Sequence, residues 1–124
     1  MKGRVLIIAG SDPSGGAGVQ ADIKTVTALG GYAAAAIAAI TVQNTKGVSA
    51  VHGVAPGVIA AQIAAVLDDI GADAIKIGMI GDRAAGVAVA DAIALHAASI
   101  PVVVDPVLVA TSGDALAGEG VAAF

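Results

Sequence analysis

The sequence Gly10-Ser11-Asp12-Pro13-Ser14-Gly15-Gly16-Ala17-Gly18 stands between two apolar segments and decides the fold. Residues 5–9 before it are continuously aliphatic, as in a buried parallel strand, and residues 16–29 have the pattern of a helix. A strand, a glycine-rich turn and a helix in this order build binding sites. The glycines let backbone N–H groups approach a ligand, and the start of the helix adds partial positive charge.

Three interpretations of this turn compete. A Walker A loop requires Lys and Ser or Thr after its last glycine, but Ala17 and Gly18 follow Gly16, which excludes it. The dinucleotide pattern G-x-G-x-x-A fits Gly16, Gly18 and Ala21, yet residues 33–42 lack the acid that should bind a ribose. A plain strand-to-helix turn is the third alternative, although it leaves the cluster of polar residues unexplained.

The composition indicates a small α/β domain with part of its surface left uncovered. Hydrophobic residues make up 57% of the 124 residues and charged residues 13%, whereas charged residues average about a quarter of a soluble domain. Parallel strands covered on both faces account for the aliphatic excess. We also expect an incomplete domain whose exposed apolar surface drives formation of a homo-oligomer or binding of a complementing chain.

Several classes of protein are disfavoured. The chain has no cysteine for a disulfide framework, and its net charge of −4 with no basic cluster argues against nucleic-acid binding. The longest strongly apolar run, residues 32–42, is too short to span a membrane. The N-terminus leads directly into a strand, so we expect no signal peptide and a cytoplasmic location.

The remaining pattern alternates strands and helices. We predict parallel strands at residues 5–9, 33–40, 74–77 and 101–104, and helices at 16–29, 57–70 and 83–97. Residues 48–54 alternate polar and apolar positions and predict a separate, half-exposed strand. Ser14 and Asp82 are candidate helix caps, and Pro56 marks a helix start.

Unusual segments follow the strand ends and should meet at one edge of the sheet, where ligands of such sheets bind. These segments are residues 10–18, 41–46, 78–79 and 105–106. Asp22, within the apolar stripe of the first helix, either contacts a ligand or bonds to nearby backbone. The groups brought together suit a small planar polar molecule: the carboxylates of Asp22 and Asp105, the amide of Gln43, and the apolar side chains of Met79 and Val107.

Together these segments resemble the hydroxymethylpyrimidine/phosphomethylpyrimidine kinases of thiamine biosynthesis, within the ribokinase-like superfamily. The resemblance covers essentially all 124 residues. Its first motif also resembles some pyridoxal kinases. The residues that carry it are Ala9 to Thr25, Thr41-Val42-Gln43-Asn44-Thr45, Lys76-Ile77-Gly78-Met79, Val104-Asp105-Pro106-Val107 and Ser112-Gly113-Asp114.

The resemblance implies an ATP- and Mg2+-dependent phosphotransferase acting on 4-amino-5-hydroxymethyl-2-methylpyrimidine and its monophosphate. The resemblance implies that the glycine-rich segment shapes the pocket of the alcohol substrate and does not bind the nucleotide. Gln43 would bond the aminopyrimidine edge, and Asp105 would organise magnesium and the transferring phosphate. The other implied substrate contacts are Asp22, backbone near Gly10 and Ala17, and ring packing by Met79 and Val107.

The chain departs from this family in its length. Family members also carry an Asn-x-x-Glu segment for magnesium and a Gly-Thr-Gly-Cys-type loop that supplies the catalytic group, and neither occurs here. We therefore interpret residues 1–124 as the N-terminal, substrate-binding half of a ribokinase-like domain, without the nucleotide-binding half and without a catalytic residue. A pyridoxal-type kinase and a non-catalytic pyrimidine-binding module remain as alternatives.

Overall fold

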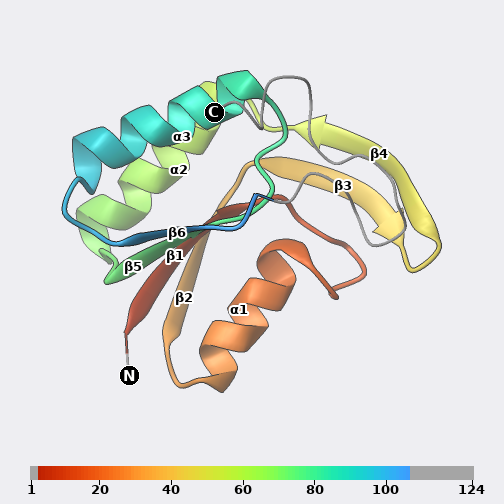
Figure 1. Ribbon diagram of the computed structural model, residues 1–124, viewed down its shortest axis with the longest axis horizontal. Helices are drawn as coiled ribbons and strands as arrows, with labels where there is room; N and C mark the ends of the chain where they lie inside the picture. The colour runs from red at the N-terminus through yellow and green to blue at the C-terminus, as the bar shows by residue number, and fades with distance from the viewer. Residues whose placement is uncertain (1–2, 107–124) are drawn as a thin grey trace.

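The computed structural model describes residues 3–106, which form two sheets and three helices (Figure 1). Two predicted segments, Val107 and residues 112–114, lie outside the described part of the chain. In order along the chain, the elements are β1 (Arg4–Ala9), α1 (Gly18–Ala28), β2 (Tyr32–Ile37), β3 (Ala39–Asn44), β4 (Gly47–Gly53), α2 (Pro56–Asp69), β5 (Ala74–Ile77), α3 (Arg83–His96) and β6 (Val102–Val104).

The main sheet is parallel, as predicted, and its strand order is β2-β1-β5-β6. β1 is central and pairs with β2 along its whole length and with β5 from Val5 to Ile8. Leu6, Ile7 and Ile8 are fully buried, which explains why this strand reads as an unbroken aliphatic run. β6 forms the edge at which Val103 and Val104 are exposed.

The helices cover the two faces of this sheet unequally. α2 and α3 lie together on one face and α1 lies on the other (Figure 1). The larger core joins Leu6, Ile8 and Ile75 of the sheet to Ile59 and Ile63 of α2. The smaller core lies under α1, where Ile7 and Ala9 pack against Val19. None of the helices within residues 3–106 is long and apolar enough to cross a bilayer.

Local signals located two helix starts correctly. Pro56 opens α2, where its missing N–H removes no helical hydrogen bond. Asp82 caps α3, and its Oδ1 accepts a hydrogen bond from the N–H of Ala85 at 2.8 Å.

The predicted start of α1 at residue 16 and the candidate cap Ser14 were wrong. The helix begins at Gly18 after Ala17, and no side chain caps it. The N–H groups of Gly16 and Ala17 donate to the Asp12 carboxylate, so these residues belong to the loop rather than to the helix.

The predicted strand at residues 33–40 is split in two. Residues 32–37 form β2, and the chain then turns at Ala38, whose N–H donates to Ala9 and whose carbonyl accepts from Val54. Ala39 and Ile40 belong to β3, which pairs in antiparallel register with β4. The half-exposed strand predicted at residues 48–54 is confirmed as β4, and the hairpin extends away from the main sheet (Figure 1).

Candidate functional site

The ends of β1, β5 and β6 and the start of the hairpin meet at one edge of the sheet, as the sequence predicted. The N–H of Gly10 donates to the carbonyl of Met79, and the N–H of Ser11 donates to Ala39, each at 2.8 Å. The N–H of Asp105 donates to Ile77 at the end of β5. Backbone hydrogen bonds therefore fix the glycine-rich loop to segments that come much later in the chain.

The loop is organised by the carboxylate of Asp12, whose side chain is only 3% exposed. Its Oδ1 accepts from the N–H and the hydroxyl of Ser14, at 2.9 and 2.6 Å. Its Oδ2 accepts from the N–H groups of Gly16 and Ala17, at 3.1 and 2.8 Å. Burial raises the pKa of Asp12, but these hydrogen bonds outweigh it and hold the pKa below its ordinary value.

The same carboxylate explains why this loop is not built to hold a phosphate. A glycine-rich loop before a helix binds anions through free N–H groups. Here the N–H groups of Gly16 and Ala17 already face an anion that belongs to the loop itself. Asp12 was not among the predicted site residues, although Asp followed two residues later by Ser is the pattern of a side chain that bonds to its own turn.

Two glycines are needed where the loop meets the sheet. Gly18 has φ +60, and a Cβ there would lie 2.6 Å from the carbonyl oxygen of Gly10. A Cβ on Gly10 would lie 2.5 Å from Cε of Met79. Met79 is buried and packs with Ala39 and Val48 beneath the hairpin. The absence of side chains at both positions lets α1, the loop and Met79 come together.

The predicted backbone contacts of Gly10 and Ala17 have partners within the protein. The N–H of Gly10 donates to Met79, and the N–H of Ala17 donates to Asp12. The carbonyl of Gly10 accepts from Val19. A carbonyl oxygen can accept a second hydrogen bond. The carbonyl groups of these residues can therefore still bind a ligand donor, whereas their N–H groups already have partners.

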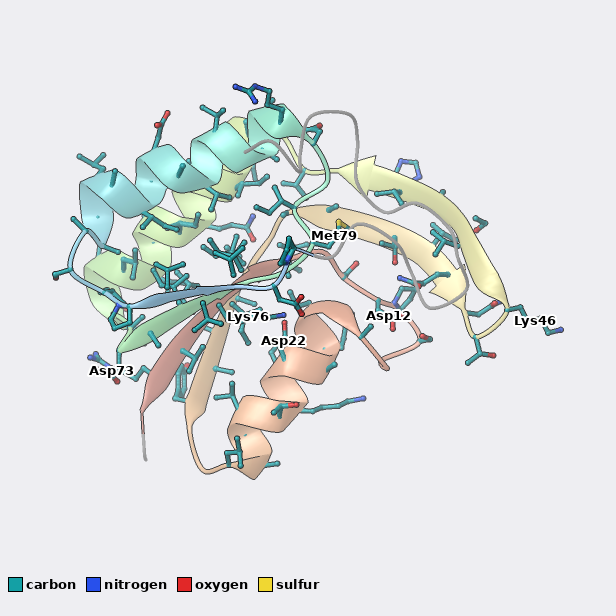
Figure 2. The ribbon with its side chains drawn as sticks, in the orientation of Figure 1. Asp12, Asp22, Lys46, Asp73, Lys76 and Met79 are labelled. Carbon is teal, nitrogen blue, oxygen red and sulfur yellow. The ribbon has the colours of Figure 1, made fainter. Side chains whose placement is uncertain are left out.

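Asp22 is paired with Lys76 and not with nearby backbone. Its Oδ2 lies 2.7 Å from Nζ of Lys76, and the two side chains are 22% and 27% exposed. The pair joins α1 to β5 close to Met79 (Figure 2). A partly buried carboxylate with a cation beside it stays available to a ligand, so the predicted substrate contact of Asp22 remains a prediction.

Gln43 lies on β3 and faces the same region. It pairs across the hairpin with Val48, which packs against Met79. Its Nε2 donates to the hydroxyl of Thr41 at 2.7 Å. Among the described residues its Oε1 has no protein partner, and one Nε2 proton also remains. Gln43 therefore offers one acceptor and one donor to a ligand.

An open hollow of about 350 Å3 lies along the hairpin. Of the predicted site residues within residues 3–106, Gln43 lines this hollow. Lys46 adds a cation at the turn of the hairpin (Figure 2). The lining residues are Val42, Gln43, Asn44, Lys46, Gly47, Val48 and Ser49.

The predicted magnesium residue Asp105 is exposed just beyond β6. Within residues 3–106 no group of three or more His, Cys, Asp or Glu side chains lies close enough to hold a metal ion. Mg2+ that arrives with a nucleotide uses one or two carboxylates and several phosphate oxygens. A single carboxylate fits that kind of magnesium site and does not fit a site built from protein groups alone.

Comparison with known proteins identifies the chain. The family model for phosphomethylpyrimidine kinase matches residues 12–124. A hydroxymethylpyrimidine/phosphomethylpyrimidine kinase of Rhizobium meliloti is 54% identical over 111 residues, which are 90% of this chain and 41% of that protein. The chain thus spans less than half the length of this curated relative.

Solved structures agree on the fold. The crystal structure of a phosphomethylpyrimidine kinase from Clostridium difficile superposes with a TM-score of 0.83 at 44% identity, covering 94% of this chain and 50% of that one. A pyridoxal kinase from Staphylococcus aureus in complex with AMP-PCP and pyridoxal gives a TM-score of 0.72 at 39% identity, covering 84% and 39%. The ribokinase-like expectation is therefore confirmed, and the chain belongs to the phosphomethylpyrimidine kinase family.

Proposed function

We propose that this chain forms the pyrimidine-binding part of a kinase of thiamine biosynthesis. The reaction is ATP-dependent phosphorylation of 4-amino-5-hydroxymethyl-2-methylpyrimidine and of its monophosphate. The observation that carries the proposal is Gln43, which is paired with Val48 beside Met79 and whose Oε1 and one N–H have no partner among the described residues. An aminopyrimidine presents an amine donor next to a ring-nitrogen acceptor, which is the complement of that pair.

The other predicted contacts complete the pocket in this proposal. Met79 packs against one ring face and Val107 against the other, and Asp22 orients a ring substituent. Gly10 and Ala17 offer carbonyl oxygens to the ring substituents. Because phosphoryl transfer depends mainly on positioning and charge neutralisation, a site spread over several loops is sufficient for it.

The nucleotide and the catalytic group belong to the remaining length of such a kinase in this proposal. Asp105 would hold Mg2+ together with nucleotide phosphates, and the bound ion would neutralise charge on the transferring group. Small-molecule substrates and ATP would be the partners, with a homo-oligomer or a complementing chain covering the exposed apolar edge at β6. A cytoplasmic location suits an enzyme supplied with ATP.

A pyridoxal-type kinase is the second candidate, because pyridoxal kinase structures superpose well on this chain. Gln43 distinguishes the two candidates, since the amine and ring nitrogen of the aminopyrimidine lie side by side and pyridoxal lacks this pair. A preference for pyridoxal over the aminopyrimidine would favour the second candidate. Tight binding of the pyrimidine with no phosphorylation in the presence of ATP would favour a non-catalytic binding module.

The test is calorimetry with each ligand on the protein in its full natural length. We expect Gln43→Ala to weaken binding of the hydroxymethyl-aminopyrimidine by about 1–3 kcal/mol, the usual cost of leaving a buried polar partner unsatisfied. Nucleotide affinity should remain unchanged. Thr27→Ala is the control, because it removes an exposed polar side chain from α1 that does not line the hollow along the hairpin. Unchanged pyrimidine affinity together with weakened nucleotide binding would show that Gln43 contacts the nucleotide and not the pyrimidine.

A further inference from the structure

Thr41 is one of two polar or charged residues buried in the described part of the chain, and it lies next to the proposed substrate contact Gln43. Its exposure is 3%. Its Oγ1 lies 2.8 Å from the carbonyl oxygen of Ser11 and 2.7 Å from Nε2 of Gln43. The sequence marked Thr41 only as the first residue of a motif, and gave no sign of its bond to Ser11, which is 30 positions away along the chain.

The direction of these two hydrogen bonds is fixed by chemistry. A threonine hydroxyl has one proton, and the carbonyl of Ser11 can only accept. The proton of Thr41 therefore points to Ser11, and Oγ1 must accept its second hydrogen bond. Gln43 can satisfy it only with Nε2, because Oε1 in that place would put two acceptors together. The network thus fixes which end of the Gln43 amide faces Thr41.

The carbonyl of Ser11 cannot easily turn away. It shares a peptide unit with the N–H of Asp12, which donates to Oε1 of Gln20 at 2.8 Å. The N–H of Ser11 donates to Ala39 at the same distance. Since a peptide unit is planar, the bond to Gln20 on one side orients the carbonyl toward Thr41 on the other. A relay of hydrogen bonds therefore runs from α1 through the loop to Gln43.

This relay decides what Gln43 can recognise. With its Nε2 end held by Thr41, Gln43 presents Oε1 and one N–H in a fixed arrangement. A 4-aminopyrimidine matches it, because its amine donates and its ring nitrogen accepts. The 4-oxo analogue has the reverse arrangement, with an accepting carbonyl beside a ring N–H. A glutamine free to rotate its amide by half a turn would match either ring.

We infer that Thr41 is a positioning residue that holds the Gln43 amide in the orientation that selects a 4-aminopyrimidine over its 4-oxo analogue. This inference rests on the proposed function and adds the basis of substrate selection. Thr41 acts through Gln43 and does not itself touch the ring. Discrimination comes from the mismatch, because a fixed, half-buried amide facing the wrong ring leaves polar groups of the complex unpaired.

The experiment measures the affinities of both pyrimidines, by calorimetry, in wild type, Thr41→Val and Thr41→Ser. We expect Thr41→Val to reduce the ratio of amino to oxo affinity by about tenfold, the value of one net hydrogen bond. Thr41→Ser keeps the hydroxyl and should keep the ratio. Thr25→Val is the matched control, because its hydroxyl donates to Ala21 within α1, away from the relay.

A second measurement tests the relay without any ligand. Solvent exchange of the two Gln43 side-chain amide protons, followed by NMR, should show one protected proton in wild type and in Thr41→Ser. Equal, fast exchange of both protons in wild type would overturn the relay even if Thr41→Val did not fold. An unchanged affinity ratio in Thr41→Val would overturn the role in selection. Failure of the wild type to bind either pyrimidine, with one amide proton protected, would refute the proposed function and leave the relay supported.

Discussion

Truncation of Asp12 tests whether the glycine-rich loop depends on its own carboxylate. In Asp12→Ala, three backbone N–H groups lose their acceptor, those of Ser14, Gly16 and Ala17. These residues are exposed, so water can bond to the freed N–H groups. Each lost hydrogen bond should therefore cost about 1 kcal/mol, less than the roughly 1.5–3 kcal/mol of a hydrogen bond to a buried charged group. We therefore expect a loss of about 2–3 kcal/mol in the free energy of unfolding.

The assay is urea unfolding at several pH values, with Asp91→Ala as the control for loss of an exposed acid. Asp12 has a pKa below its ordinary value of 3.8 in the folded state. Its contribution is therefore fully present above that pH and is lost as the pH falls through the folded pKa. The difference between wild type and Asp12→Ala should be constant from about pH 5 to 8 and shrink below pH 4.

The reasoning would be refuted by a difference that stays the same down to pH 2.5, or by one below about 0.5 kcal/mol at pH 7, the range of ordinary surface substitutions. Asp12→Asn separates charge from geometry. It keeps an oxygen for Ser14 but turns an NH2 group toward Gly16 and Ala17. We expect it to lose about 2 kcal/mol, because two donors then face donors.

Two further predictions concern other parts of the fold. Gly18→Ala should destabilise the protein by about 1–3 kcal/mol in urea unfolding, because φ is +60 and the new Cβ would meet the carbonyl of Gly10. A change within about 0.5 kcal/mol, as for ordinary surface substitutions, would show that the loop shifts freely. Nη2 of Arg4 lies 3.0 Å from Oδ1 of Asp73, and the hydrogen bonds from Arg4 lower the pKa of Asp73 to about 2. The stabilisation from this ion pair should therefore be complete above pH 4 and disappear toward pH 2. Melting temperatures of wild type and Asp73→Asn should converge over that interval, and parallel curves would contradict the assignment.

The sequence predicted elements best where the deciding interactions are local. The aliphatic run of β1, the proline at the start of α2 and the cap at Asp82 act within a few residues of the structure they specify. The convergence of strand ends followed from parallel topology alone. Met79, just after β5, therefore lies at the predicted edge, and Gln43 lies on the hairpin that begins there.

The errors arose where distant partners decide the structure. Nothing in residues 33–40 marks a break, and the turn at Ala38 depends on hydrogen bonds to Ala9 and Val54. Asp22 was expected to meet a ligand or nearby backbone, whereas its partner Lys76 lies 54 positions along the chain. Thr41 was not singled out for the same reason. Side-chain partners so far apart leave no periodic signal in a single sequence.

The position of β1 at the centre of the sheet has a consequence for synthesis of the chain. Its partner β2 follows directly after α1, whereas its other partner β5 follows only after the hairpin and α2. While residues 38–73 are being added, one side of β1 is an apolar strand edge with unpaired backbone groups. Such edges pair readily with other chains. During this stretch of translation, the nascent protein therefore exposes an edge through which it can aggregate.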